Sequence, residues 1–143
     1  MRYSFKINYL KKIRFIDLYA GLGGFHQALE ELGHKCVWAS EYNLNLRELY
    51  KKNFPGTPIE GDIFKVDLNE IPNHDLICGG FPCQPFSRAG KMLGFEDLKK
   101  GNHFFKILEI LDFKKENAPK YIFLVFWKTA RLHSSKRTLL RLR

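Results

Sequence analysis

The sequence has few cysteines, and none of them stands in a pattern typical of metal binding or disulfide pairing. Three cysteines occur in 143 residues, without a CxxC or a Cys/His metal spacing. Disulfide-stapled domains and zinc sites need such patterns, so we expect neither a disulfide framework nor a bound metal. Unpaired cysteines are typical of a reducing compartment.

Long apolar runs are also missing. The first twelve residues include four Lys or Arg, but no apolar stretch of signal-peptide length follows them, and none approaches the length of a membrane span. We therefore expect a cytoplasmic protein without a membrane partner. The length of 143 residues predicts one domain with a real hydrophobic core.

Acidic residues are absent from positions 125–143, which contain six Lys or Arg and supply two thirds of the net charge of +9. Such a charge favours a polyanionic partner, although a solvated basic face is its commoner cause. The patterns that indicate strands and helices stop at residue 124. We therefore predict a basic extension over residues 1–12, a folded domain over residues 13–124 and a basic tail over residues 125–143.

Strand-like apolar runs alternate with helical patterns along residues 13–124. This alternation favours a doubly wound, mainly parallel α/β sheet. Strands are expected at residues 13–19, 36–39, 57–60, 75–78 and 121–124. The expected buried faces of the helices are Phe25, Ala28, Leu29 and Leu32, then Leu46, Leu49 and Tyr50 behind an Asn43 cap, and finally Phe104, Ile107, Leu108 and Leu111.

A glycine turn, Gly-Leu-Gly-Gly at residues 21–24, connects the first strand to the first helix. It lacks the complete dinucleotide fingerprint, so a tight structural turn explains it equally well. Glu41 lies twenty residues after Gly21 at the end of the second strand, where an acidic side chain accepts hydrogen bonds from ribose hydroxyls in this architecture. The two features together favour a nucleoside ligand such as S-adenosylmethionine over a dinucleotide.

Asp62 follows the third strand at the same expected edge of the sheet. Its carboxylate is placed to accept the amino group of an adenine, with Ile63 against the ring. The carboxylate is equally well placed to cap the next turn, and the residues alone do not separate these two roles.

The loop at residues 79–87 reads Gly-Gly-Phe-Pro-Cys-Gln-Pro-Phe-Ser and directly follows the fourth strand. Prolines on both sides of Cys83 restrict the backbone, and the paired glycines allow close approach to a ligand. Arg88 and Lys91 favour the thiolate, which is the nucleophilic form of cysteine. We interpret Cys83 as a nucleophile and Cys36 and Cys78, which lie in apolar runs, as buried residues.

Residues 88–100 form a basic, glycine-containing segment whose composition fits a loop near DNA and equally fits any solvated loop. No histidine has the local context of a catalytic partner for Cys83. We interpret as surface or capping residues His26, His34, His74, His103 and His133.

Two segments together resemble a known family. They are residues 15–25, Phe-Ile-Asp-Leu-Tyr-Ala-Gly-Leu-Gly-Gly-Phe, and residues 81–87, Phe-Pro-Cys-Gln-Pro-Phe-Ser. In composition, order and approximate spacing they resemble the DNA cytosine C5-methyltransferase family, over residues 13 to about 124. The resemblance implies the Rossmann-like fold of S-adenosylmethionine-dependent methyltransferases, incomplete at its carboxyl end.

The resemblance also implies a reaction and its residues. Cys83 would add to C6 of a cytosine flipped out of double-stranded DNA, and C5 would then take a methyl group from S-adenosylmethionine, as in restriction–modification systems. The donor site would comprise Asp17, Tyr19, Ala20, Gly21, Leu22, Gly23, Gly24, Glu41, Tyr42, Asp62, Ile63 and Pro82. The residues near DNA would be Gln84, Ser87, Arg88 and Lys91.

The sequence departs from the family after the fifth expected strand. The family has a glutamate there that acts at N3 of the cytosine, whereas this chain has Val125, Phe126 and Trp127. The family's later arginine-bearing segment and sequence-reading domain are also absent, which suggests a truncated or frameshifted gene. We expect a methyltransferase impaired on its own; the alternative is a non-catalytic relic, or one subunit of a split enzyme that needs a complementing chain.

Overall fold

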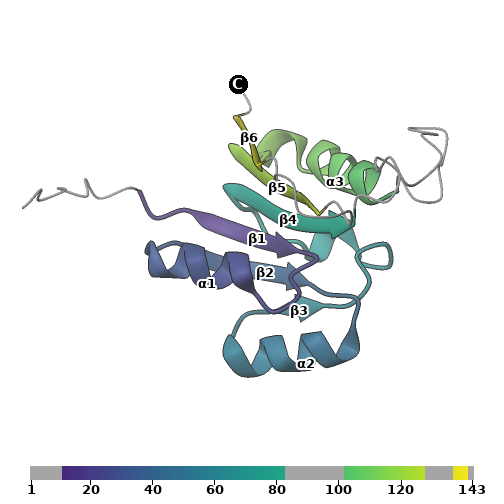
Figure 1. Ribbon diagram of the computed structural model, residues 1–143. Helices are drawn as coiled ribbons and strands as arrows, with labels where there is room; N and C mark the ends of the chain where they lie inside the picture. The colour runs from purple at the N-terminus through teal and green to yellow at the C-terminus, as the bar shows by residue number, and fades with distance from the viewer. Residues whose placement is uncertain (1–10, 83–101, 128–136, 142–143) are drawn as a thin grey trace, which may run out of the picture.

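The computed structural model describes residues 11–82, 102–127 and 137–141. In these residues six strands form one sheet in the order β3-β2-β1-β4-β5-β6 (Figure 1). The strands are β1 (Arg14–Leu18), β2 (Lys35–Ser40), β3 (Ile59–Glu60), β4 (Leu76–Pro82), β5 (Tyr121–Trp127) and β6 (Arg137–Arg141). The helices are α1 (Gly24–Glu31), α2 (Leu44–Asn53) and α3 (Asn102–Phe113), with short 3-10 helices η1 (Leu68–Glu70) and η4 (Lys115–Asn117).

The topology of the sheet indicates the edge at which a ligand would bind. Strands β1 to β5 are parallel, and β6 runs antiparallel to β5. The strand order grows from β1 toward β3 and then resumes on the other side of β1 with β4, so the order reverses between β1 and β4. Sheets of this kind bind ligands at the carboxyl ends of their strands near that reversal. The prediction of a doubly wound, mainly parallel sheet is confirmed.

The larger apolar core lies between the sheet and α3. Successive side chains of a strand point to opposite faces, and Ile16 and Leu18 of β1 point to this face. There they pack with Ile77 of β4 and with Ile107 and Ile110 of α3, all of which are buried. Burial of each such side chain contributes about 1.5–3 kcal/mol, so this cluster holds α3 against β1 and β4.

The opposite face of the sheet carries α1. Phe15, Cys36 and Cys78 are buried there, with Phe25 and Leu29 of α1 packed against them. The two cysteines are free and buried, as predicted. Burial raises the pKa of Cys36 to about 12, so this thiol stays protonated at neutral pH. The two faces together give the layered arrangement seen in Figure 1.

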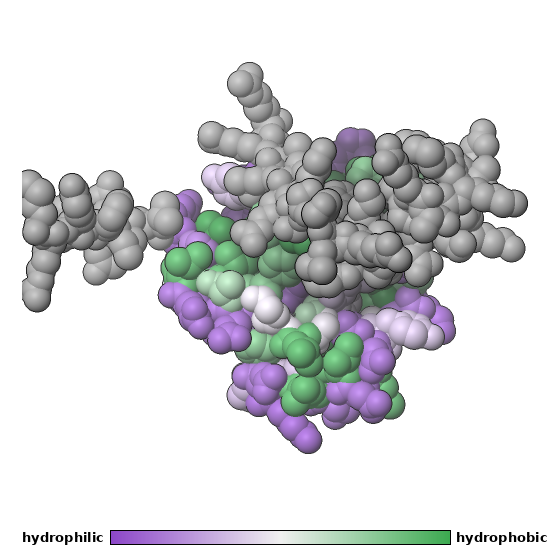
Figure 2. Space-filling model, in the orientation of Figure 1, coloured by the Kyte–Doolittle hydropathy of each residue, from purple (hydrophilic) through white to green (hydrophobic). Residues whose placement is uncertain are grey.

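Helix α2 begins where the sequence predicts but buries less than expected. Asn43 caps it, since its side chain accepts the N–H groups of Asn45 and Leu46 at 3.0 and 3.2 Å. Tyr50 is fully buried, whereas Leu49 is 42% exposed, so the predicted apolar face is wrong at Leu49. Leu49 is exposed because α2 lies between β2 and the two-residue edge strand β3, where the sheet offers little surface to cover the helix. Figure 2 shows apolar side chains exposed over α2.

The expectation of a surface position is wrong for His26 and His74, which are 2% and 4% exposed. His26 is buried in α1 although it is not part of the predicted apolar face, whereas Leu32, which is, directly follows the end of α1 and is 68% exposed. A histidine is tolerated there because its Nδ1 shares a hydrogen bond of 2.7 Å with the hydroxyl of buried Tyr50. Leu108 of α3 is likewise exposed, contrary to expectation.

The carboxyl-terminal strands extend beyond the predicted elements. β5 continues to Trp127 and pairs there with Pro82 of β4, so the strand is longer than the predicted strand that ends at residue 124. β6 lies inside the predicted tail, where the sequence indicates no strand. Among the residues that the structure describes, no helix is long and apolar enough to cross a membrane.

Candidate functional site

The chain leaves β1 through a turn with left-handed backbone. Tyr19, Gly21 and Gly23 have φ values of 56°, 57° and 83°. The N–H of Gly23 donates to the carbonyl of Ala20, and the N–H of Ala20 donates to the carbonyl of Ser40, both at 2.9 Å. Left-handed backbone costs a non-glycine residue such as Tyr19 roughly 1–2 kcal/mol. The turn is therefore held in a costly conformation by its contacts.

Gly23 packs directly against a shelf of aromatic rings. A Cβ atom there would collide with Cε2 of Phe54 and lie 2.9 Å from its Cζ. Phe54 stacks on His26, with ring centroids 3.8 Å apart, and His26 bonds to Tyr50. Only glycine allows the turn to approach this shelf so closely.

Glu41 links the turns that follow β1 and β2. Its Oε2 accepts the N–H of Gly21 at 2.8 Å, and its Oε1 accepts the N–H of Asn43 at 2.7 Å. Its carbonyl accepts Nη1 of Arg47 at 3.2 Å. A carboxylate has about four acceptor positions, so two remain for other donors. Glu41 thus stands at the expected edge, fixed by the backbone and still able to accept hydrogen bonds.

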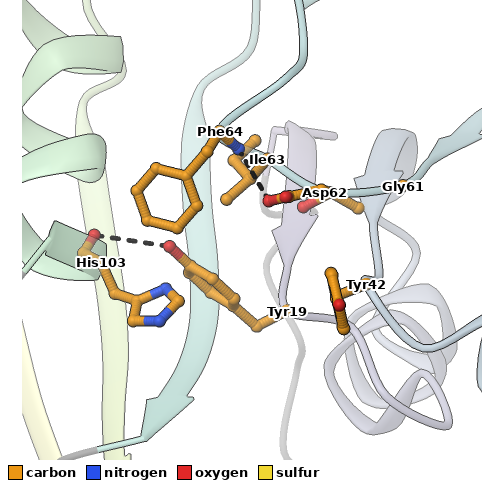
Figure 3. A pocket seen from close by; sticks show the side chains of 8 residues that line it. Tyr19, Tyr42, Gly61, Asp62, Ile63, Phe64 and His103 are labelled. Atoms are coloured by element: carbon orange, nitrogen blue, oxygen red, sulfur yellow. Dashed lines mark hydrogen bonds between the residues drawn. The ribbon is translucent and has the colours of Figure 1, made fainter. Parts of the chain in front are cut away.

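A cavity of about 310 Å³ lies at the carboxyl ends of β1, β2 and β3; Ser40 and Tyr42, the chain neighbours of Glu41, line it, whereas Glu41 itself does not. Its volume is at the lower end of the range for small-molecule sites. Four residues predicted for the donor site line it: Tyr19, Tyr42, Asp62 and Ile63 (Figure 3). The other lining residues are Ser40, Gly61, Phe64 and His103.

The walls of the cavity are mainly aromatic rings. His103 meets Tyr19 and Phe64 edge-on, with both centroid distances 5.1 Å, and Figure 3 shows these three side chains pointing toward one another. The Tyr19 hydroxyl donates to the carbonyl of His103 at 3.4 Å. Burial, and then the charge of Asp62, raise the pKa of Tyr19, while burial lowers the pKa of His103 despite Asp62. Both rings are therefore uncharged at neutral pH.

Asp62 is the one carboxylate among the lining residues. Its Oδ1 accepts the N–H of Phe64 at 3.1 Å, so it caps the turn after β3 and keeps further acceptor positions. Both alternatives left open by the sequence are therefore compatible with its geometry. A cavity with flat uncharged walls and one acceptor suits a planar heteroaromatic ring that carries an amino group.

The sequence analysis did not predict Phe64 and His103 as residues of the cavity. Phe64 directly follows Ile63 in a segment without periodicity, and its place after a predicted ligand residue is the only available signal. His103 comes from α3 and meets Tyr19, which lies 84 positions earlier in the chain. No local pattern indicates that contact.

Several predicted donor residues do not line the cavity. Asp17 is fully buried, and neither carboxyl oxygen has a hydrogen-bond partner of good geometry among the described residues. Burial raises its pKa well above the usual range, and the backbone N–H of His26 opposes this only in part. Ala20 is 8% exposed, Leu22 is 60% exposed, and Gly24 is the first residue of α1.

The predicted nucleophile falls outside the described residues. β4 runs to the carboxyl edge of the sheet and ends at Pro82, which directly precedes Cys83 in the chain. Outside the described part lie Cys83, Gln84, Ser87, Arg88 and Lys91. In the part of the chain that is described, no three His, Cys, Asp or Glu side chains group in a way that could hold a metal ion.

The sheet has the Rossmann-like fold of the S-adenosylmethionine-dependent methyltransferase class, and the cavity lies at its carboxyl edge. Solved structures agree. A crystal structure of a Spodoptera frugiperda DNMT2 mutant matches 81% of this chain and 36% of its own with a TM-score of 0.61 and 35% identity. The S. pombe Dnmt2 methyltransferase matches 81% of this chain and 35% of its own, with a TM-score of 0.61 and 26% identity.

The chain belongs to the C-5 cytosine-specific DNA methylase family, whose model matches residues 13–139. It is 46% identical over 130 residues to the type II methyltransferase M.HhaI of Haemophilus parahaemolyticus, covering 91% of this chain and 38% of that protein. It is 43% identical over 129 residues to M.DsaV of Dactylococcopsis salina, covering 90% and 35%. The chain thus spans little more than a third of these relatives and matches their amino-terminal part. The resemblance noted in the sequence is confirmed.

Proposed function

We propose that this chain is the donor-binding and nucleophile-bearing part of a DNA cytosine C5-methyltransferase of the restriction–modification type. The observation that carries the proposal is the ring-lined cavity at the carboxyl ends of β1, β2 and β3, at the edge to which β4 leads the chain before Cys83. Relatives of this chain that are named type II methyltransferases support the substrate class.

The residues at the edge fit S-adenosylmethionine. The flat walls formed by Tyr19 and Phe64 suit an adenine ring, and Asp62 offers an acceptor for its amino group. Glu41 keeps acceptor positions for ribose hydroxyls after holding Gly21 and Asn43. We assign to the donor site the whole predicted set, with Ile63, Tyr42 and Pro82 around the adenine and methionine and the glycine turn along the donor. When bound, the cofactor supplies an electrophilic methyl group.

Cys83 is proposed to act on the cytosine. Its thiolate would form a bond to C6, which makes C5 electron-rich, and C5 would take the methyl group from the sulfonium donor, which would leave as S-adenosylhomocysteine. Loss of the C5 proton then breaks the C6–S bond and releases the thiolate. Because C6 is hidden in a stacked base, the cytosine must first leave the duplex. Gln84, Ser87, Arg88 and Lys91 are proposed to lie near the extruded nucleotide in double-stranded DNA.

The isolated chain is proposed to be impaired. Attack at C6 is easier when a protonated group meets N3, and β5 carries Val125, Phe126 and Trp127 where the family has its glutamate. A general acid contributes about 10²–10⁴ in rate. A complementing chain that brings this glutamate and a sequence-reading domain would restore activity. The domain boundaries at residues 12 and 124 and the cytoplasmic location remain predictions.

Calorimetry with S-adenosylmethionine tests the donor site. Glu41→Ala removes the acceptors for the ribose and for two turns, and a hydrogen bond to a charged group contributes about 1.5–3 kcal/mol, so affinity should fall at least tenfold. Cys83→Ser should bind the donor like the unaltered chain, because the thiol belongs to the cytosine site. Glu48→Ala is the matched control, since Glu48 is an exposed carboxylate of α2 paired only with Lys51 among the described residues.

Equal losses in Glu41→Ala and Cys83→Ser would contradict the assignment of separate donor and nucleophile residues. A folded, unaltered chain that binds no S-adenosylmethionine would contradict the proposed donor site itself.

A further inference from the structure

The amino ends of the strands form an edge opposite to the cavity, and they carry basic side chains. Arg14 is the first residue of β1, Lys35 is the first residue of β2, and Lys120 directly precedes β5; all three are exposed. In the strand order β2-β1-β4-β5, Lys35 stands at β2, Arg14 at the neighbouring β1, and Lys120 at β5. We call them the basic row. Strands lie about 4.8 Å apart, so the row spans roughly 14 Å.

Backbone hydrogen bonds fix the row in place. Lys35 donates its N–H to the carbonyl of Ile13 at 3.0 Å, and Asp75 donates its N–H to the carbonyl of Arg14 at 2.7 Å. Lys120 donates its N–H to the carbonyl of Asp75 at 2.9 Å. The three positions therefore belong to the rigid sheet and keep their spacing. The pairing of Arg141 in β6 with Tyr121 of β5 puts a further basic residue at the same edge.

Carboxylates lie near the row, but in the part of the chain that the structure describes they do not pair with its side chains. Asp75 is the acidic residue between Arg14 and Lys120, and its Oδ2 accepts the backbone N–H of Arg14 at 2.9 Å rather than a side chain. Among the described residues, none of the three side chains of the row makes an ion pair. The other nearby carboxylates belong to the ends of α1 and to η4: Glu30, Glu31 and Glu116.

Buried His74 lies just before β4, close to this edge. Its pKa is lowered first by burial and then also by the positive charges of Lys114 and Arg14, whereas Asp75 and the carbonyl of Pro72 raise it. Two cations thus act on one side chain beside the start of β4. Lys114 directly follows α3 and is a further basic residue on this side of the sheet. Figure 2 shows hydrophilic side chains at the left, where β1 begins.

We propose that the basic row binds the phosphate backbone of duplex DNA without reading its sequence, on the edge of the sheet opposite to the donor cavity. Lys and Arg that neutralise phosphates release condensed counterions, which supplies most of the affinity of non-specific binding. The choice of duplex DNA among polyanions rests on the proposed function. The contact itself needs neither a cytosine, nor the donor, nor Cys83, so it adds an anchoring site to the proposed enzyme.

Fluorescence anisotropy with a labelled duplex of roughly 20 base pairs, made only of A·T pairs, tests the row. Binding is measured without donor at several salt concentrations from about 50 to 200 mM, the range over which phosphate contacts change affinity strongly. The test variant is Arg14→Gln/Lys35→Gln/Lys120→Gln. The control is Lys51→Gln/Lys52→Gln/Lys65→Gln, which removes the same charge from exposed lysines of α2 and of the segment after β3.

The slope of log affinity against log salt is negative, and its magnitude falls by about 0.9 for each phosphate that the protein no longer neutralises. We expect the test variant to lower the magnitude of the slope by roughly two to three, and the control to lower it by less than about one. Equal changes in the two variants, or no change in the test variant, would overturn the proposal. Melting curves verify that both variants fold, and Lys35→Gln and Lys120→Gln alone should each lower the magnitude of the slope by about 0.9.

The duplex contains no cytosine, so recognition of the target base does not contribute to binding. Phosphate contacts proposed for Arg88 and Lys91 are the same in the test and control variants and do not contribute to the difference between them. A slope of smaller magnitude in the test variant together with no S-adenosylmethionine binding would contradict the proposed function and leave the row supported. Donor binding together with an unchanged slope in the test variant would support the proposed donor site and contradict the proposal for the basic row.

Discussion

Replacement of Gly23 by alanine should destabilise the protein through two separate effects. The residue has a φ of 83°, in the left-handed region that disfavours a side chain. A new Cβ would also collide with Cε2 of Phe54 and lie 3.0 Å from Cε2 of Tyr50. Neither ring can withdraw easily, because Phe54 stacks on His26 and Tyr50 is fully buried.

The first effect is backbone strain at residue 23 itself, and the second is steric contact with Phe54 and Tyr50. Left-handed backbone costs an alanine roughly 1–2 kcal/mol. Overpacking against the shelf costs about 1–3 kcal/mol. We therefore expect Gly23→Ala to lower the free energy of unfolding by about 2–5 kcal/mol. This is a large part of the roughly 5–15 kcal/mol typical of a domain.

Urea unfolding followed by circular dichroism measures the change, with Gly24→Ala as the matched control. Gly24 is the neighbouring residue and opens α1, and a Cβ added to it would meet no atom within 4 Å. Alanine there should be neutral or stabilise the protein by up to about 1 kcal/mol. Similar effects of the two substitutions would refute the packing argument.

The steric part can be isolated with Phe54→Ala. In that background Gly23→Ala should lose the overpacking contribution and keep the backbone cost, so its effect should shrink by about 1–3 kcal/mol. The same destabilisation in both backgrounds would show that Phe54 is not the obstacle.

Three further outcomes are expected. The isolated chain should incorporate no detectable tritiated methyl group into mixed-sequence DNA, and incorporation that disappears in Cys83→Ser would prove this wrong. Buried Cys36 and Cys78, whose pKa values are raised by burial, should not react with a disulfide reagent at a pH of about 8 until urea unfolds the chain; native Cys83→Ser should therefore take up no label. Because burial raises the pKa of Asp17 above its unfolded value, its contribution to stability falls as pH rises from about 4. Asp17→Asn should accordingly melt higher than the unaltered chain at a pH of about 7.5, with the advantage fading toward a pH of about 4; a constant difference would contradict the assignment.

Much of the fold follows from local patterns. Each of the five predicted strands and three predicted helices is present, because short apolar runs, glycine stops and the Asn43 cap act over a few residues. The errors concern which side of a helix is buried. Leu49 is exposed because α2 leads to the edge strand β3, and Leu108 is exposed although α3 packs on the central strands, since α3 buries only the stripe that carries Ile107 and Ile110. His26 is buried because a tyrosine from another helix satisfies its ring nitrogen.

The strands near the carboxyl end show a different limit. β5 runs three residues past its predicted end, since its pairing with β4 continues to Pro82. β6 has no alternating pattern in Arg-Thr-Leu-Leu-Arg and is defined by its antiparallel pairing with β5. A strand recognised only through its partner cannot be read from its own residues.

The sequence by itself determined the edge at which the site stands. Glu41 and Asp62 follow parallel strands, and the carboxyl ends of parallel strands must meet on one side of the sheet, so their proximity follows from chain order. Tertiary structure alone decided the walls and the support of that site: His103 reaches Tyr19 from a helix 84 positions away, Phe54 and Tyr50 close in beneath Gly23, and Glu41 uses two acceptor positions for backbone N–H groups. These contacts join segments that no local periodicity relates, because packing depends on the three-dimensional arrangement of elements and not on the identity of neighbours in the chain.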